Sequence, residues 1–290
     1  MTSESTAPII RTVLHPSDFS EASLVAFAHA LQAALISGSK LVLLHVTDED
    51  ETQPTEFPRV RETLERWKLL PAGSPRSAVA ELGIDVAKVI GNAPNPAKGV
   101  LGFIERYSAD LVVLATHHHG LDWLHHSISE PVARKSGEMT LFVPAEAHGF
   151  VSLTDGSVSL RNILIPIATT PRPEPAVAGA ARLIEQLKCE SGKFTLLHVG
   201  ENGSAPSVVT PDVDGWTWQR MTRQGNVIEA ILETAREADA DLILMSTDGR
   251  NGFLDALRGS HSERVVRHAP CPLLAIPESS HVATSMPAMS

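Results

Sequence analysis

The chain has 290 residues and a formal net charge of −10, with 24 Lys and Arg residues against 34 Asp and Glu residues. This balance argues against binding to nucleic acid or acidic membranes, because affinity for phosphate backbones rests on clustered Lys and Arg. The two cysteines, Cys189 and Cys271, lie far apart, so neither a disulfide framework nor a cysteine-based zinc site is expected.

No apolar run approaches the roughly 20 residues that a helix needs to cross a bilayer. Residues 1–6 lack the basic start of a secretion signal. The sequence therefore predicts a globular protein of the cytoplasm.

Strands and helices alternate along the first half of the chain. Buried strands are predicted by apolar runs at residues 9–14, 40–46 and 109–114. Ser20 is placed to cap a helix, further helices are expected near residues 59–70 and 100–107, and residues 91–96 suggest a turn. Because strands that alternate with helices form parallel sheets, we expect an α/β fold.

The same order of segments recurs in the second half. Four stretches return with similar residues: 13–16 as 163–166, 43–46 as 196–199, 109–114 as 240–245, and 129–134 as 262–267. Such internal self-similarity indicates two copies of one structural unit. We predict a first domain at residues 9–145, a second at residues 159–278, and a linker at residues 146–158, where Gly, Ser, Thr and Asp interrupt the pattern.

The second copy is shorter than the first between two matched points. The span from Val199 to Asp241 contains fewer residues than the span from Val46 to Asp110. We therefore expect the second copy to lack most of one helix and to retain a loop at residues 200–215.

One stretch of the second copy has the features of a phosphate site. A buried strand at residues 242–245 precedes Gly249, and Gly259 and Ser260 then open a helix. Ligands of open α/β sheets bind beyond the carboxyl ends of the strands, and the start of a helix offers free N–H groups to an anion. The pattern predicts a nucleotide phosphate site, although the same glycines and serines would also serve as turn and cap residues without a ligand.

These motifs resemble the universal stress protein family in its tandem two-domain form. The resemblance rests on the segment 16–21 after the first strand, the Leu-Leu-His-Val second strand, and Gly249-x9-Gly259-Ser260 followed by Ser262-Glu263. It implies two Rossmann-like units, each with roughly five parallel strands flanked by helices. Many members of this family bind ATP through two glycines, a nine-residue gap and a third glycine followed by Ser or Thr, and others bind none.

The second copy has the expected residue at three of the four positions of the family pattern, and Ser246 stands at the first glycine position. Ala168 stands where the family usually has an Asp near the base or ribose, and the loss of one such hydrogen bond costs about 1 kcal/mol. The resemblance thus implies weakened binding of ATP, ADP or AMP, with Mg²⁺. The residues expected around the nucleotide are Pro166, Ile167, Ala168, Val199, Ser246, Asp248, Gly249, Gly259, Ser260, His261 and Ser262.

The first copy departs from the pattern in the opposite way. It keeps Asp18, but Ala115, His118 and His126 stand at the three glycine positions. An imidazole would obstruct the approach of a phosphate to the backbone. We expect no nucleotide site of the family kind here, and we expect Asp18 to cap the following helix.

Five histidines cluster after the fourth strand of the first copy, at residues 117–119 and 125–126. They could hold zinc, with His117 and His119 projecting similarly from an extended loop and Asp122 as a further ligand. The simpler alternative is a solvated polar loop, because no cysteine is nearby and a third or fourth ligand is required.

Catalysis finds little support in the sequence. Ser260, His261 and Asp248 are the residue types of a hydrolase triad, but no Gly-x-Ser-x-Gly elbow is present and adjacent Ser and His side chains point apart. We expect a binding protein rather than an enzyme, with slow ATPase activity as the alternative. His45 and His198, at the ends of buried strands, are expected to be structural.

The family resemblance also bears on partners. It implies that the last strands of the two copies, near residues 139–143 and 273–276, pair the copies within one chain, and it leaves a further homodimer open. The chain would act as a stress-response regulator or sensor through its conformation or an unknown protein partner. The alternative is an interaction protein with both nucleotide sites vestigial and a metal site in its first half.

Overall fold

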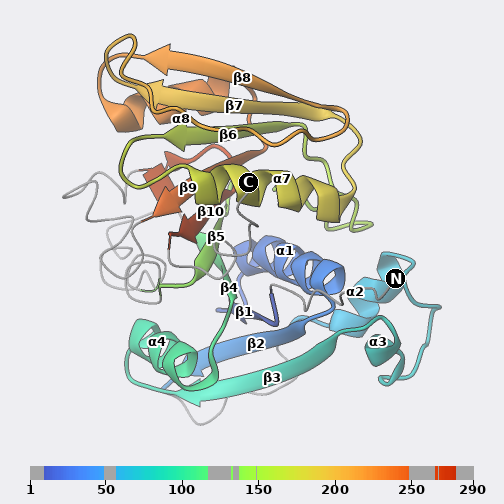
Figure 1. Ribbon diagram of the computed structural model, residues 1–290. Coiled ribbons are helices and arrows are strands. Elements are labelled where there is room, and N and C mark those ends of the chain that lie inside the picture. The colour runs from blue at the N-terminus through green and yellow to red at the C-terminus, as the bar shows by residue number, and fades with distance from the viewer. Residues whose placement is uncertain are drawn as a thin grey trace, which may run out of the picture.

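The computed structural model describes residues 10–48, 57–116, 132, 137–147, 149–247, 265–266 and 268–278. Ten strands form its centre (Figure 1). They are β1 (Thr12–Pro16), β2 (Lys40–Thr47), β3 (Asp85–Asn92), β4 (Leu111–Thr116), β5 (Met139–Pro144), β6 (Asn162–Ile167), β7 (Gly192–Val199), β8 (Trp216–Arg223), β9 (Leu242–Thr247) and β10 (Leu273–Pro277). The helices of the described ranges are α1 (Glu21–Ser37), α2 (Val60–Arg66), α3 (Ala78–Glu81), α4 (Pro96–Tyr107), α7 (Glu174–Leu187) and α8 (Val227–Glu237).

The strands form one sheet in which two parallel units meet at β5 and β10. The order β3-β2-β1-β4-β5 of the first copy is continued by β10-β9-β6-β7-β8, which is the same order reversed. All pairings within each unit are parallel, whereas β5 and β10 pair antiparallel, with Leu141 opposite Leu274. The predicted fold class is confirmed, and the last strands pair the two copies within the chain as expected.

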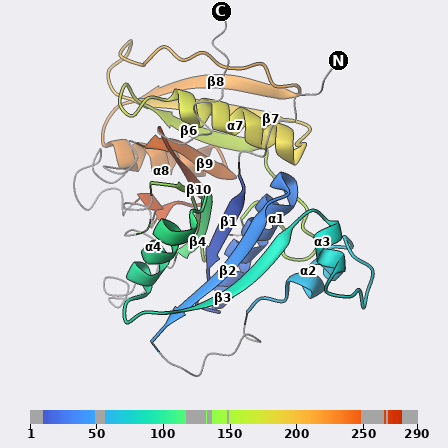
Figure 2. The ribbon, with the colours of Figure 1, turned by 60° about the horizontal axis from the view of Figure 1, so that its bottom comes forward.

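Helices cover both faces of the sheet (Figure 2). α1 and α7 pack on one face, where Leu31 and Ile184 belong to one apolar cluster, and α4 and α8 pack on the other, where Ile104 and Ile231 belong to a second. Because the sheet is buried on both faces, its central strands are continuous apolar runs rather than alternating ones. Each cluster contains residues of both copies, so the copies share their cores.

Each copy ties the start of its first strand to the start of its fourth strand through one aspartate. Oδ2 of Asp110 accepts the backbone N–H groups of residues 11–12, both at 2.9 Å. Asp241 accepts those of residues 161–162 at 2.7 and 2.8 Å. The repeated Ala-Asp of the sequence therefore has a structural role in both copies.

The boundaries of two elements differ from the prediction. β3 extends through Asn92, where a turn from Gly91 was expected, because pairing with β2 outweighs the weak strand preference of its Asp, Lys, Gly and Asn residues. α4 begins at Pro96 rather than near Val100, because the side chain of Asn95 caps its first turn. The Ser20 cap of α1 is confirmed.

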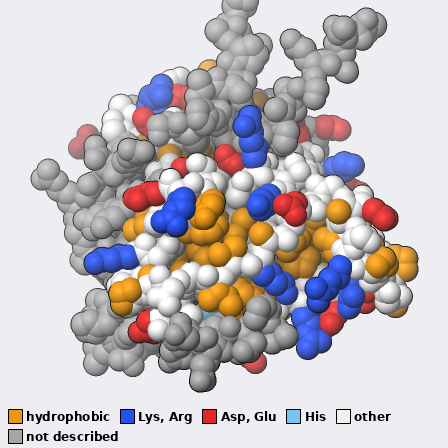
Figure 3. All heavy atoms as spheres, turned by 90° about the horizontal axis from the view of Figure 1, so that it is seen from below, with side chains coloured by type: hydrophobic (Ala, Val, Ile, Leu, Met, Phe, Trp, Pro, Cys, Tyr) orange, Lys and Arg blue, Asp and Glu red, His pale blue; other side chains and the backbone are white. Residues whose placement is uncertain are grey.

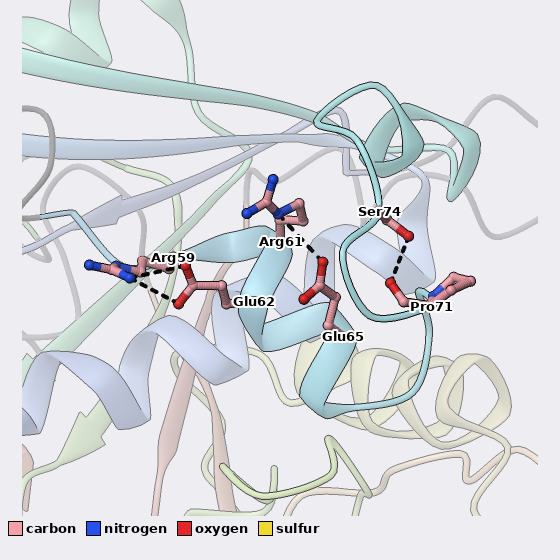
Figure 4. Close-up of polar contacts among 6 residues, drawn as sticks. All are labelled: Arg59, Arg61, Glu62, Glu65, Pro71 and Ser74. Carbon is pink, nitrogen blue, oxygen red and sulfur yellow. Dashed lines mark hydrogen bonds and ion pairs between the residues drawn. The ribbon is translucent and has the colours of Figure 1, made fainter.

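The first copy inserts α2 and α3 between its second and third strands. Leu64 of α2 is buried, and the helix also carries the ion pairs Arg59–Glu62 and Arg61–Glu65, with N–O distances of 3.0 and 3.5 Å (Figure 4). The Arg59–Glu62 pair is exposed and contributes little to stability, whereas the side chain of Glu65 is only 18% exposed. The insertion is therefore held by its buried apolar side chains together with the partly buried Arg61–Glu65 pair.

The second copy has no helix in the corresponding stretch, residues 200–215, all of which the structure describes. The indole N–H of Trp218 donates to the carbonyl of Pro211 at 2.8 Å, and Val208 and Val213 are buried in the core. This loop therefore replaces the helices of the first copy, as the shorter spacing predicted.

The sheet ends at β3 and β8. In the described part of the chain, β3 pairs with β2 alone, and Ile90 on this edge strand is 39% exposed. Figure 3 looks at this side from below and shows hydrophobic side chains across the middle of the face, with Lys and Arg around them.

Residues 149–160, which connect the copies, pack against α1 and α2. The backbone N–H of Phe150 donates to Nε2 of His29 at 3.1 Å, and the indole N–H of Trp67 donates to the carbonyl of Leu153 at 3.2 Å. The ring of Phe150 is buried edge-on against His29. The connection thus contributes to the core of the first copy.

Candidate functional site

The candidate site lies at the carboxyl ends of β6 and β9. From β6 the chain proceeds outward to β7, and from β9 it proceeds in the opposite direction to β10. A crevice at such a reversal is where open α/β sheets bind ligands. The structure brings the described part of the predicted site to this edge, namely Pro166, Ile167, Ala168, Val199 and Ser246.

These five residues divide between the two faces of the sheet. Ala168 is exposed, and Pro166 and Val199 are partly exposed, so all three are accessible to a ligand. Ile167 is 6% exposed and belongs to the core beneath α7. Its side chain therefore packs in the core, and only its backbone carbonyl is available at the carboxyl end of β6.

Ser246 has a structural contact of its own. Its hydroxyl oxygen accepts the backbone N–H of Ala176, in the first turn of α7, at 3.1 Å, and the residue is 6% exposed. Pro173, the residue before α7, has no side-chain hydrogen bond that caps the helix. Ser246, which lies on β9, therefore accepts one of the N–H groups that have no partner within α7.

The remaining predicted residues lie outside the described residues: Asp248, Gly249, Gly259, Ser260, His261 and Ser262 in the second copy, and His117 and His119 in the first. Within the described ranges, no group of three or more His, Cys, Asp or Glu side chains could hold a metal ion. The same ranges contain no helix that is both long and apolar enough to span a membrane.

Near the end of the second strand of each copy, a histidine ring contacts a backbone carbonyl at or just after the end of the first strand. Nδ1 of His45 lies 2.7 Å from the carbonyl oxygen of Ser17, and Nδ1 of His198 lies 3.3 Å from that of Ile167. Nε2 of His198 is also 2.9 Å from the hydroxyl oxygen of Ser204. Both rings therefore support the carboxyl ends of the strands, in agreement with the predicted structural role.

In the first copy, aromatic side chains pack over the carboxyl ends of the strands. The ring of Phe19 stacks on His45 with centroids 4.1 Å apart, and its edge meets the buried ring of Phe57 at 5.2 Å. Phe19 has a φ of 62°, a left-handed conformation that is uncommon for a bulky residue. In the second copy the residue at the position of Phe19 is the exposed Thr169, so among the described residues this edge has no counterpart of the Phe19 ring.

Asp18 organises the first turn of α1. Its Oδ1 accepts the backbone N–H of Ser20 at 3.0 Å and the hydroxyl groups of Ser20 and Ser23, both at 2.6 Å. The hydroxyl oxygen of Ser20 in turn accepts the N–H of Ser23 at 3.2 Å. The cap of α1 is therefore Ser20, and the carboxylate that the family places near a nucleotide holds this cap in place, where the sequence had predicted Asp18 as a cap itself.

Replacing Asp18 with Ala is expected to lower the free energy of unfolding by about 1–2 kcal/mol, because several donors at the start of α1 lose their acceptor. Denaturant unfolding measures this change. Asp85→Ala is the control, since its carboxylate is 3.9 Å from Lys40 and largely exposed, and we expect less than about 0.5 kcal/mol. Equal losses in the two variants would show that the Asp18 network has no special role.

A carboxylate that sequence reasoning missed lies at the rim of the site. Glu278 follows β10, and its backbone N–H donates to the carbonyl of Thr247 at 2.7 Å. Its carboxylate accepts the backbone N–H of Arg172, and Oε2 lies 3.8 Å from Nε of the same arginine. The two residues are 106 positions apart, so no local spacing could reveal the contact.

Comparison with known proteins identifies several relatives. The sequence profile of the universal stress protein family matches residues 10–144 and 216–277. Universal stress proteins of Thermus aquaticus and Methanocaldococcus jannaschii are 45% and 42% identical to this chain over 53 residues, which is 18% of its length. These matches span 39% and 31% of the two relatives, well under half of either protein.

A solved structure extends the likeness over nearly the whole chain. The universal stress protein from Archaeoglobus fulgidus DSM 4304 aligns with a TM-score of 0.57 and 18% identity over 92% of this chain and 98% of that one. At this identity the likeness is one of fold.

Proposed function

Because this chain belongs to the universal stress protein family, we propose that it binds one adenine nucleotide, in its second copy, and acts as a stress-response regulator rather than as an enzyme. The ligand is ATP, or the related ADP or AMP. The base would lie against Pro166 and Val199. The phosphates, with Mg²⁺, would lie on the loop that follows β9 and carries Gly249 and Gly259.

The observation that carries this proposal is the difference between the two copies at the same edge of the sheet. In the first copy Phe19, His45 and Phe57 pack together over the ends of the strands. In the second copy Ala168 and Thr169 are exposed, and Val199 is partly exposed. Accessible apolar surface at a topological reversal is the kind of place where a base binds.

Ala168 offers a direct test, because the family pattern has an Asp at this position. Ala168→Asp is expected to tighten ATP binding about fivefold, since a carboxylate can accept a hydrogen bond worth about 1 kcal/mol from the ribose or base. Calorimetric titration of the full chain with ATP and Mg²⁺ measures the change.

Thr169→Asp is the matched control, because it adds the same charge one residue further along the exposed loop. We expect no gain, or a small loss from repulsion of the phosphates. A variant Ala168→Asp that binds ATP no more tightly than the unaltered chain would place the ligand elsewhere.

A protein that acts only through partner contacts is the second candidate. The contact between Ser246 and Ala176 favours it, because the hydroxyl at the first glycine position already serves α7. A chain that binds no ATP, ADP or AMP at millimolar concentration would support this candidate over the first.

A further inference from the structure

Glu278 and Arg172 join two segments at the rim of the candidate site. The carboxylate of Glu278 accepts the backbone N–H of Arg172 and lies beside its guanidinium group, with Oε2 and Nε 3.8 Å apart. The side chain of Arg172 is 68% exposed and that of Glu278 is 26% exposed. The pair is therefore accessible from solvent and can open without unpacking the core.

The contact crosses the end of β9. Arg172 lies in the loop that leaves β6, Glu278 follows β10, and β9 is the strand between them. The backbone N–H of Glu278 is bonded to Thr247, the last residue of β9. The two side chains thus meet where the chain leaves β9.

The first copy has the same backbone arrangement without the ion pair. The N–H of Ala145 donates to the carbonyl of Thr116 at 2.8 Å, as that of Glu278 does to Thr247. Ala145 has no carboxylate to offer the neighbouring loop, and Asp18 organises that loop instead. The contact between Glu278 and Arg172 therefore belongs to the copy in which Thr169 stands at the position of Phe19.

An N–H group beside a guanidinium group is a combination that binds phosphate oxygens as well as carboxylate oxygens. We propose that Glu278 and Arg172 form a charge latch: Glu278 holds the position that a nucleotide phosphate takes, and the phosphate must displace it to reach Arg172. This inference rests on the proposed function. It adds that the second copy limits its own affinity for nucleotide, through the carboxylate of the residue that follows β10.

The latch predicts opposite effects for its two members. Glu278→Ala gives this position the residue of the first copy, and ATP affinity is expected to rise about threefold because a competing anion is removed. Arg172→Met is expected to lower the affinity about threefold, because the phosphate loses its cation. Glu185→Ala, which removes an exposed carboxylate at the far end of α7, is the control and should leave the affinity unchanged.

The double variant separates the latch from a general effect of charge. In the Arg172→Met background, Glu278→Ala should give a much smaller gain, since the carboxylate no longer competes for the arginine. A gain of the same size with and without Arg172 would overturn the latch and indicate simple repulsion between Glu278 and the nucleotide.

The same titrations distinguish failure of the latch from failure of the proposed function. If the unaltered chain binds ATP and Glu278→Ala binds it equally well, the latch is wrong and nucleotide binding stands. If Glu278→Ala binds ATP and the unaltered chain does not, both are supported. If neither protein binds any nucleotide, both are wrong. Hydrogen exchange at the Arg172 amide, expected to be faster in Glu278→Ala, checks the contact without ligand.

Discussion

Replacing Phe142 with Ala is expected to lower the free energy of unfolding of the whole chain by about 3–5 kcal/mol, the usual cost of removing a large buried ring. Phe142 lies on β5 and is 0% exposed, and its partner across the antiparallel pair is Leu273 of β10. The apolar cluster around it contains side chains of α4 and of α8. A cavity at this place weakens the cores of both copies.

The structure therefore predicts one cooperative transition, shifted as a whole, when Phe142→Ala is unfolded in denaturant and followed by circular dichroism. Tyr107→Ala is the control, because that side chain is 59% exposed at the end of α4. We expect it to change stability by less than about 1 kcal/mol. Two separate transitions, of which only one moves in Phe142→Ala, would show that the copies fold independently.

Lowering the pH from about 6.5 to about 4 is expected to destabilise the folded chain strongly, because two histidines are buried without charge in the first copy. Burial lowers the pKa of His15 and of His29 from 6.5 to about 4. For His15, the carbonyl of Val113 and the nearby carboxylate of Asp18 offset part of this effect. Both rings are neutral in the folded protein at pH 6.

The sign follows from proton uptake. Between pH 6.5 and 4 the unfolded chain binds protons at these two rings and the folded chain does not, so the free energy of unfolding falls as the pH falls. The stabilisation is complete above about pH 6.5, and each ring contributes on the order of 3 kcal/mol across this window. Denaturant unfolding at a series of pH values measures the slope.

His15→Ile is the informative variant for this slope. The matching residue of the second copy is Ile165, which is 0% exposed, so an isoleucine suits this position in the fold. Nε2 of His15 has no hydrogen-bond partner among the described residues, whereas Nδ1 lies 2.9 Å from the carbonyl oxygen of Val113, so the substitution removes one buried hydrogen bond. The variant should lose about 1 kcal/mol of stability at pH 7, for the missing hydrogen bond, and about half of the pH dependence. An unchanged slope would assign the acid sensitivity to other groups.

Most of the fold could be predicted from the repeated segments of the sequence. Apolar runs such as residues 40–46 predict strands that are buried on both sides. The structure has such strands because helices cover both faces of the sheet. The pairing of β5 with β10 followed from the family resemblance. β3 could not be predicted from its own residues, because an edge strand with Lys88 and Asn92 owes its conformation to its partner strand.

The candidate site was only partly open to prediction. The family resemblance implied that Pro166, Ala168 and Val199 surround a nucleotide. The structure places all three at or next to the carboxyl ends of β6 and β7, and their contact with a nucleotide stays a prediction. The contacts of Phe19 with Phe57 and of Glu278 with Arg172 join residues far apart in the chain, and they depend on how loops fold over the strand ends. No spacing rule or local propensity describes such contacts.

Calorimetric titration of the full chain with ATP and Mg²⁺ tests the difference between the two copies most directly. One ATP is expected to bind per chain, more tightly after Ala168→Asp and with unchanged affinity after Asp18→Ala. Two equivalent sites, or a single site that is lost with Asp18 and indifferent to Ala168, would contradict the assignment of nucleotide binding to the second copy.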